Sequence, residues 1–240
     1  MNYERAIKYF LDSKIAIIMG VILLVVALGL FAAEYTIGGL IAIVIAILCF
    51  IAASKTVKDE EIDAMLASEM EKLEHNALNK LGLEKDEISY ADPIKFCGWN
   101  YSDSTGSRNI SDKTIDDLDD KCGKDEKWRS PVAELHFFAF SENTVHYYCK
   151  YISLVSDTNR EKTEEYFYKD IVSVRTDTKV ISRWDSSKKE VDSSKKIKIN
   201  TFDITTSGGV GIACSVYDSN IAESAVNAMR SLLKQKKMQQ

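Results

Sequence analysis

The sequence predicts a membrane-anchored α+β protein. We expect a two-helix transmembrane hairpin, a stalk helix, and then a bent antiparallel sheet of seven strands with a C-terminal helix. Two observations support this fold class. Apolar residues crowd into residues 15–53, where the short connector holds the single charged residue. Downstream of Pro93, the apolar positions change from a helical period to the two-residue period of strands.

Composition and charge argue against several classes of function. A net charge of −5 does not favour binding to nucleic acid. The five cysteines are scattered without a Cys-x-x-Cys pair, which argues against a disulfide framework and against a zinc site. We therefore expect no cofactor and no metal. The thiols suit a reducing compartment, in which each acts as a small hydrophobic group.

Two uncharged runs predict the membrane hairpin. They cover residues 15–33 and 37–53, and a helix needs roughly 20 apolar residues to cross about 30 Å of hydrocarbon. The connector over residues 34–36 is so short that the two helices must be antiparallel neighbours. A signal peptide cleaved near Ala33 is the alternative, but the first run is longer than a usual signal core and the second follows at once.

The distribution of Lys and Arg predicts the orientation of this hairpin. Three such residues lie in the N-terminal stub over residues 1–14, the connector has none, and Lys55 and Lys58 follow the second run. Both termini should therefore face the cytoplasm in a two-pass protein of the inner cell membrane, with the lipid bilayer as a partner. The stub is either a short amphipathic helix in the interface or simple flanking sequence.

Residues 54–82 predict a charged stalk helix with one narrow apolar stripe. Gly82 and Leu83 at its end are typical of a left-handed C-terminal cap. Two interpretations of the stripe are open. It either packs on the chain's own domain or forms a seam for a homo-oligomer. The stripe consists of Ile62, Leu66, Met70, Leu73, Ala77 and Leu81.

The domain over residues 91–240 should contain seven strands and a final helix. Short turns over residues 141–143 and 207–209 suit hairpins between neighbouring strands. The final helix should run over residues 220–237, where Asp218, Ser219 and Asn220 all offer N-caps. The predicted strands cover residues 94–101, 132–140, 144–154, 163–168, 171–181, 196–205 and 210–217.

The order of these elements and two short segments resemble a known family. The segment Tyr166-Phe-Tyr-Lys-Asp-Ile-Val-Ser-Val174 is similar to the turn from the fourth to the fifth strand in bacterial-type pleckstrin-homology (PH) domains. Phe202-Asp-Ile204 and the Gly-Gly turn after it also fit. The resemblance covers residues 91–240 and implies a helix that closes one open end of a bent sheet. The loop over residues 102–131 departs from the family because it is unusually long.

Catalysis finds little support in the residue types and their spacing. His136 and His146 lie on strands joined by a tight turn and could be near each other, but a metal site needs further ligands. The acidic residues between Asp112 and Glu126 lack the spacing of a calcium-binding loop and predict a solvated, mobile segment. Because there is no nucleophile–base pair or metal cluster, we predict that the protein is not an enzyme.

A tandem repeat is the most unusual feature of the sequence. Asp185-Ser-Ser-Lys-Lys is followed at Asp192 by the same five residue types. The repeat concentrates lysines at a strand connection, where they either contact anionic lipid or form a solvated turn. The candidate lipid contacts are Lys188, Lys189, Lys195, Lys196 and Lys198.

The resemblance also implies a function. Lipid-binding PH domains typically hold the headgroup with basic residues in the first hairpin loop. This loop is acidic here, which favours an unidentified protein partner. We therefore predict a non-enzymatic, membrane-anchored binding module, a scaffold or sensor that presents its PH-like domain at the cytoplasmic membrane surface. The alternatives are an oligomeric membrane-active or transport subunit built from the hairpins, and a sensor of anionic lipid through residues 188–198.

Overall fold

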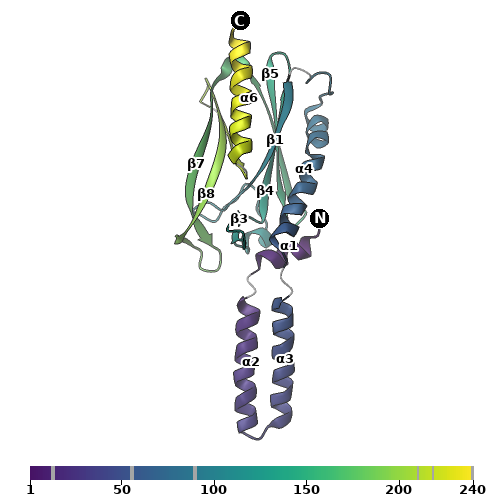
Figure 1. Cartoon of the computed structure of the whole chain (residues 1–240), viewed down its shortest axis with the longest axis vertical. Coiled ribbons are helices and arrows are strands. Elements are labelled where there is room, and N and C mark those ends of the chain that lie inside the picture. The colour runs from purple at the N-terminus through teal and green to yellow at the C-terminus, as the bar shows by residue number, and fades with distance from the viewer. Residues whose placement is uncertain (12–13, 55–56, 89–90, 210, 218, 239–240) are drawn as a thin grey trace.

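Antiparallel strands form the body of the molecule, and a pair of helices extends from one end of it (Figure 1). This is a computed structural model, and it describes all residues except 12–13, 55–56, 89–90, 210, 218 and 239–240. Three predictions fall on residues outside this range. They are the orienting charge of Lys55, the strand start at Val210 and the N-cap at Asp218.

The described strands fall into three antiparallel sheets rather than one bent sheet of seven strands. The sheets have the orders β1-β4-β5-β6, β2-β3 and β7-β8-β9. The 3₁₀ turn η1 (Tyr168–Asp170) separates β6 from β7, so the first sheet does not continue into the third. The strands are β1 (Ala91–Trp99), β2 (Lys121–Cys122), β3 (Trp128–Arg129), β4 (Val132–Phe140), β5 (Thr144–Ser153), β6 (Asn159–Phe167), β7 (Ile171–Asp185), β8 (Glu190–Thr206) and β9 (Gly211–Val216).

The helices lie at the start, on the outer face of the first sheet and at the C-terminus (Figure 1). Of the two interpretations of the N-terminal stub, a short helix is present as α1, but it buries Ala6, Tyr9 and Phe10 in the core of the body and not in a membrane interface. The helices are α1 (Tyr3–Phe10), α2 (Lys14–Ala32), α3 (Thr36–Ser54), α4 (Asp59–Leu81), α5 (Lys113–Asp116) and α6 (Ser219–Met238).

Two hydrophobic cores lie on opposite faces of the first sheet. Because successive side chains of a strand point to opposite faces, β4 contributes to both. Leu135 and Phe137 join the core that includes α4, and Phe138 and Phe140 join the core that includes β8 and α6. Every residue of β4 is buried, which explains its nearly unbroken apolar sequence.

The helix α4 packs along the first sheet and is not a free stalk. Its stripe residues Ile62, Leu66, Leu73 and Ala77 are buried in the first core, and Met70 is partly buried against it. The chain's own β4 and β5 therefore cover the surface that we considered for self-association. The predicted cap is confirmed, because Gly82 adopts a left-handed conformation with φ of 67°.

The structure corrects the membrane anchor predicted over residues 15–53. Within the part of the chain that the structure describes, no helix is long and apolar enough to cross a membrane. The predicted two-pass topology of the inner membrane, with cytoplasmic termini, is therefore not supported. The fold class becomes α+β with antiparallel sheets of four, two and three strands.

Candidate functional site

The tandem repeat forms the same local turn twice. In each copy, an aspartate oxygen accepts hydrogen bonds from the backbone N–H and the hydroxyl of the serine two residues later. Asp185 Oδ1 lies 3.1 Å from Ser187 N and 2.6 Å from Ser187 Oγ. Asp192 Oδ1 lies 3.1 and 2.5 Å from the same atoms of Ser194. The first turn joins β7 to β8. The second is a bulge inside β8, where residues 193–195 have no partner in β7.

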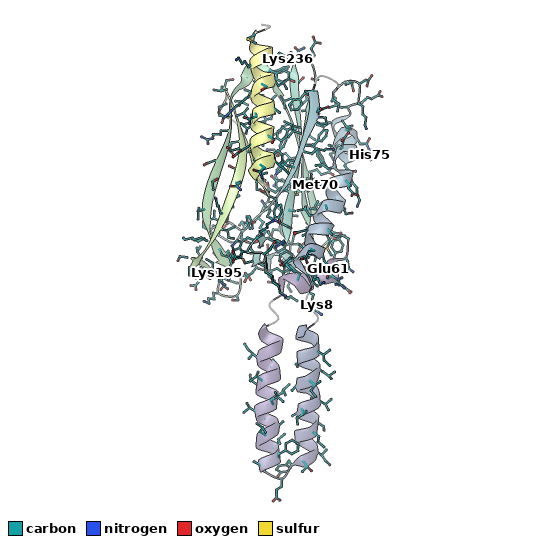
Figure 2. All side chains as sticks on the ribbon, viewed as in Figure 1. Lys8, Glu61, Met70, His75, Lys195 and Lys236 are labelled. Carbon is teal, nitrogen blue, oxygen red and sulfur yellow. The ribbon has the colours of Figure 1, made fainter. Side chains whose placement is uncertain are left out.

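These turns divide the five candidate lysines. Lys188 and Lys189 lie at the tip of the β7–β8 hairpin. Lys195 lies in the bulge, at the end of the body from which α2 and α3 extend (Figure 2). Lys196 and Lys198 lie beyond the bulge and line a cleft. The structure therefore brings two of the five lysines into one site.

The cleft has a volume of about 380 Å³ and lies between β8 and the β2–β3 hairpin. Its positive charge comes from Lys127, Lys196 and Lys198, and its negative charge from Glu126. Four aromatic residues from the ends of β1, β3 and β9 also line it: Trp99, Tyr101, Trp128 and Tyr217.

Contacts among the aromatic residues hold this aromatic wall in place. The rings of Trp99 and Tyr217 meet edge to face, with 6.3 Å between their centroids. The hydroxyl of Tyr101 donates to the carbonyl oxygen of Trp128 at 2.9 Å, and burial raises the pKa of Tyr101 and keeps it neutral. Lys127 Nζ lies 5.1 Å from the centre of the Tyr217 ring, within reach of a cation–π interaction.

The cleft follows an open edge of β8. β9 pairs with β8 up to the pair Asn200–Val216. The next residue, Tyr217, donates its backbone N–H to the carbonyl oxygen of Cys97 in β1 at 2.8 Å. Among the described residues, β8 therefore pairs with β7 alone over residues 196–199. Lys198 and Ile199 both line the cleft. Since neighbouring side chains of a strand point to opposite faces, the cleft must run along the strand's edge.

A glycine and a buried carboxylate hold the end of β9 against β1. A Cβ atom on Gly98 would collide with the backbone oxygen of Ser215, so only glycine permits this approach. Glu134, buried on β4, accepts hydrogen bonds from Asn100 Nδ2 at 2.6 Å and from Ser215 N at 3.4 Å. Burial opposes its ionisation, but hydrogen bonds from His136, Asn100 and Ser215 outweigh burial and lower the pKa of Glu134.

Two polar atoms of the cleft residues lack a partner. Trp99 Nε1 and Ser215 Oγ are buried, and neither has a hydrogen-bond partner among the described residues. Trp99 is 3% exposed and yet lines the cleft. A buried polar group without a partner costs about 1–3 kcal/mol. A ligand that accepts a hydrogen bond from Trp99 would remove that cost.

A buried arginine anchors the β2–β3 hairpin, which forms the opposite wall. The guanidinium of Arg129 is fully buried and binds two carboxylates, each through two nitrogen atoms. It lies 2.8 and 2.6 Å from the oxygens of Asp63 on α4 and 2.9 Å from both oxygens of Asp125. The hydrogen bonds from Arg129 lower the pKa of Asp125 to about 2. Such paired contacts hold the hairpin rigidly on α4.

Internal contacts hold part of the acidic loop, which we expected to be a mobile, solvated segment, and four of its acidic residues are exposed: Asp116, Asp117, Asp125 and Glu126. Asp120 is buried 3.1 Å from Arg108, and Asp119 lies 3.1 Å from Arg183 of β7. Asp112 caps α5 by accepting from Ile115 N at 2.9 Å. Arg108 of the same loop and Arg183 of β7 thus neutralise part of the negative charge of this loop.

The histidines do not form a common site. His136 lies 3.1 Å from Glu134 and 3.0 Å from the hydroxyl of Tyr147 inside the second core. His146 instead contacts Glu165 at 3.2 Å, and His75 lies on the outer side of α4 (Figure 2). In the described part of the chain, no group of three or more His, Cys, Asp or Glu residues could hold a metal ion.

The helices α2 and α3 expose a large apolar surface. Alanines lie where the two helices meet, and Ala27 and Ala46 are 1% and 0% exposed. The larger side chains point outward, and Val25, Leu28 and Ile37 are 64%, 70% and 75% exposed. Exposed apolar surface of this extent favours association with other apolar surfaces.

Comparison with known proteins found no matching family model, no similar curated protein and no matching solved structure. The resemblance to PH domains therefore stays a prediction, and the chemistry of the cleft is the basis for the function.

Proposed function

We propose that the protein is a non-enzymatic binding module whose aromatic cleft holds a segment of a partner protein. The observation that supports this most is the gathering of four aromatic residues and three lysines around one cleft. Tyr and Trp are enriched in the buried centres of protein interfaces, where they supply large contact areas. Their polar edges also give a bound segment hydrogen-bonding partners.

The chemistry of the cleft favours binding over covalent reaction. Ser215 offers a hydroxyl group, but its Oγ has no hydrogen-bond partner among the described residues and thus no base to activate it. Lys196 Nζ donates to Ser182 Oγ at 2.8 Å, and Lys127 lies over the ring of Tyr217. Amines in these positions attract anionic groups.

The alternative functions have less support. The lysines expected to bind anionic lipid are separated, because Lys188, Lys189 and Lys195 lie outside the cleft that Lys196 and Lys198 line. Glu190 also lies 3.9 Å from Lys188 and weakens its charge. The oligomeric membrane-active subunit depended on the membrane hairpins, which the structure does not support.

Peptide selection tests this proposal. A random-peptide phage library is panned against the immobilised full chain, and enriched peptides are titrated against the parent and Trp128→Ala. We expect the variant to bind at least about tenfold more weakly, because loss of an aromatic anchor costs about 2 kcal/mol or more. Phe167→Ala is the matched control, since Phe167 is an exposed aromatic residue of β6 outside the cleft. Thermal unfolding verifies that each variant is folded.

Two results would contradict the proposed function. One is the failure of the parent chain to enrich any peptide. The other is equal affinity of the enriched peptides for the parent and for folded Trp128→Ala.

A further inference from the structure

We infer that the partner segment binds as an added β-strand along residues 196–199 of β8, and that this segment is acidic. The inference rests on the proposed function and specifies how the cleft holds its ligand and which chemical class of peptide it selects.

The open edge of β8 provides the backbone partners. A strand directs its N–H and C=O groups alternately to its two neighbours. Over residues 200–205, β8 has both neighbours, β7 and β9. Over residues 196–199, within the described structure, it has β7 alone. The backbone groups that face away from β7 are therefore available to a peptide that continues the line of β9.

The aromatic wall lies where this added strand would run. The cleft is lined by β8 on one side and by Trp99, Trp128 and Tyr217 on the other. Alternate side chains of an extended peptide point to opposite sides, so every second residue would face one wall of the cleft. Trp99 Nε1 has no hydrogen-bond partner in the described structure but is buried, so a carbonyl or carboxylate oxygen of the peptide can accept from it only after the Trp99 ring shifts.

The charge around the open edge favours one class of peptide. Lys196 and Lys198 lie on the edge itself, and Lys127 lies on the facing hairpin. Lys198 is exposed and has no ion-pair partner among the described residues. Lysines on an edge strand repel the same edge of a second copy, which argues against self-pairing through β8. They attract an acidic segment instead.

The test uses a short synthetic peptide that alternates glutamate and valine, with blocked termini. It is titrated against the full chain in a non-ionic detergent, and binding is measured by calorimetry. We expect saturable binding that is at least about tenfold tighter than that of the same peptide with lysine in place of glutamate. Methylation of single backbone nitrogens should weaken binding about tenfold at every second position and little at the positions between.

A charge reversal in the protein provides the matched variants. Lys198→Glu should abolish the preference, because the cleft is then lined by two lysines and two glutamates, and the two peptides should bind about equally. Lys188→Glu, at the hairpin tip outside the cleft, should leave the preference of the parent unchanged.

The outcomes separate this inference from the proposed function. The acidic class is wrong if library peptides bind through Trp128 but the glutamate peptide does not bind. It is also wrong if Lys198→Glu prefers the glutamate peptide over the lysine peptide as strongly as the parent does. If methylation weakens binding at all positions equally or at none, strand addition is wrong. The proposed function itself would survive either result, because its own test depends on Trp128→Ala.

Discussion

The backbone N–H of Tyr217 donates to the carbonyl oxygen of Cys97 at 2.8 Å, and this hydrogen bond lies at the point where β9 stops pairing with β8. The strand β9 thereby connects the first and third sheets. Because the chain turns toward β1 here, the edge of β8 over residues 196–199 has no second strand among the described residues. This hydrogen bond therefore marks the place where the two sheets join and where the open edge beside the cleft begins.

The close approach of β9 to β1 predicts that Gly98→Ala destabilises the fold. The added Cβ would collide with the backbone of Ser215, and the strands must separate to relieve it. We expect a loss of about 1–3 kcal/mol in the free energy of unfolding, measured by urea denaturation. Gly208→Ala is the control, because nothing lies within 4 Å of a Cβ at that position. Equal stability of the two variants would show that the approach is not tight.

The buried guanidinium of Arg129 predicts a large effect of Arg129→Met. The substitution leaves Asp63 and Asp125 facing each other without a cation. Breaking a buried ion pair costs about 3–5 kcal/mol, and partial exposure of both carboxylates reduces this to about 2 kcal/mol. Urea denaturation measures the loss. Lys72→Met, which removes an exposed ion pair with Glu69, should change stability little. An Arg129→Met variant as stable as Lys72→Met would contradict the anchoring role.

The pKa of Asp125 predicts part of the acid sensitivity of the fold. Hydrogen bonds from Arg129 lower this pKa from 3.8 to about 2 in the folded chain. Asp125 therefore stabilises the fold above pH 3.8, and its contribution is lost as the pH falls toward 2. Asp125→Asn should be less stable than the parent at neutral pH, and the difference should shrink at about pH 2. Urea denaturation across this range measures it, with Asp86→Asn in an exposed turn as control. A constant difference would refute the assignment.

The apolar surface of α2 and α3 predicts self-association in water. Light scattering on a sizing column, in buffer without detergent, should show the parent chain as large, heterogeneous assemblies. Changing Val25, Leu28 and Ile37 together to Gln should shift the population toward smaller species. The control is the double variant Val172→Gln and Val180→Gln. These two residues of β7 are about as exposed as Val25, and the control should not change the size of the assemblies. A monomeric parent chain would contradict this prediction.

The sequence pattern predicted most of the individual elements. The bounds of β4 are those predicted, because a tight turn follows it and its residues are apolar except for Glu134 and His136. The period of three to four residues predicted α4, but it could not identify the residues that pack on the apolar stripe of this helix. The covering residues, such as Leu135 and Phe137, lie far along the chain.

The candidate site could not be predicted from sequence patterns. Its walls come from four separate segments, and Trp99, Trp128, Lys198 and Tyr217 each lie in or just beyond an ordinary strand. The strands β2 and β3 have two residues each, too few to give a period. The pairing of Arg129 with Asp63 joins residues that no local pattern connects. The lysine repeat was visible, but its division between a hairpin tip and a strand edge depends on the bulge in β8.

Hydrogen exchange along β8 tests the central claim most directly. The backbone amides of residues 196–200 are followed in the full chain, with and without a saturating amount of the glutamate–valine peptide. The account predicts that the peptide slows exchange at alternate amides over residues 196–199. The amide of Asn200, where pairing with β9 begins, should change little. Unchanged exchange over residues 196–199 with the peptide bound would contradict the claim that the open edge of β8 is the binding site.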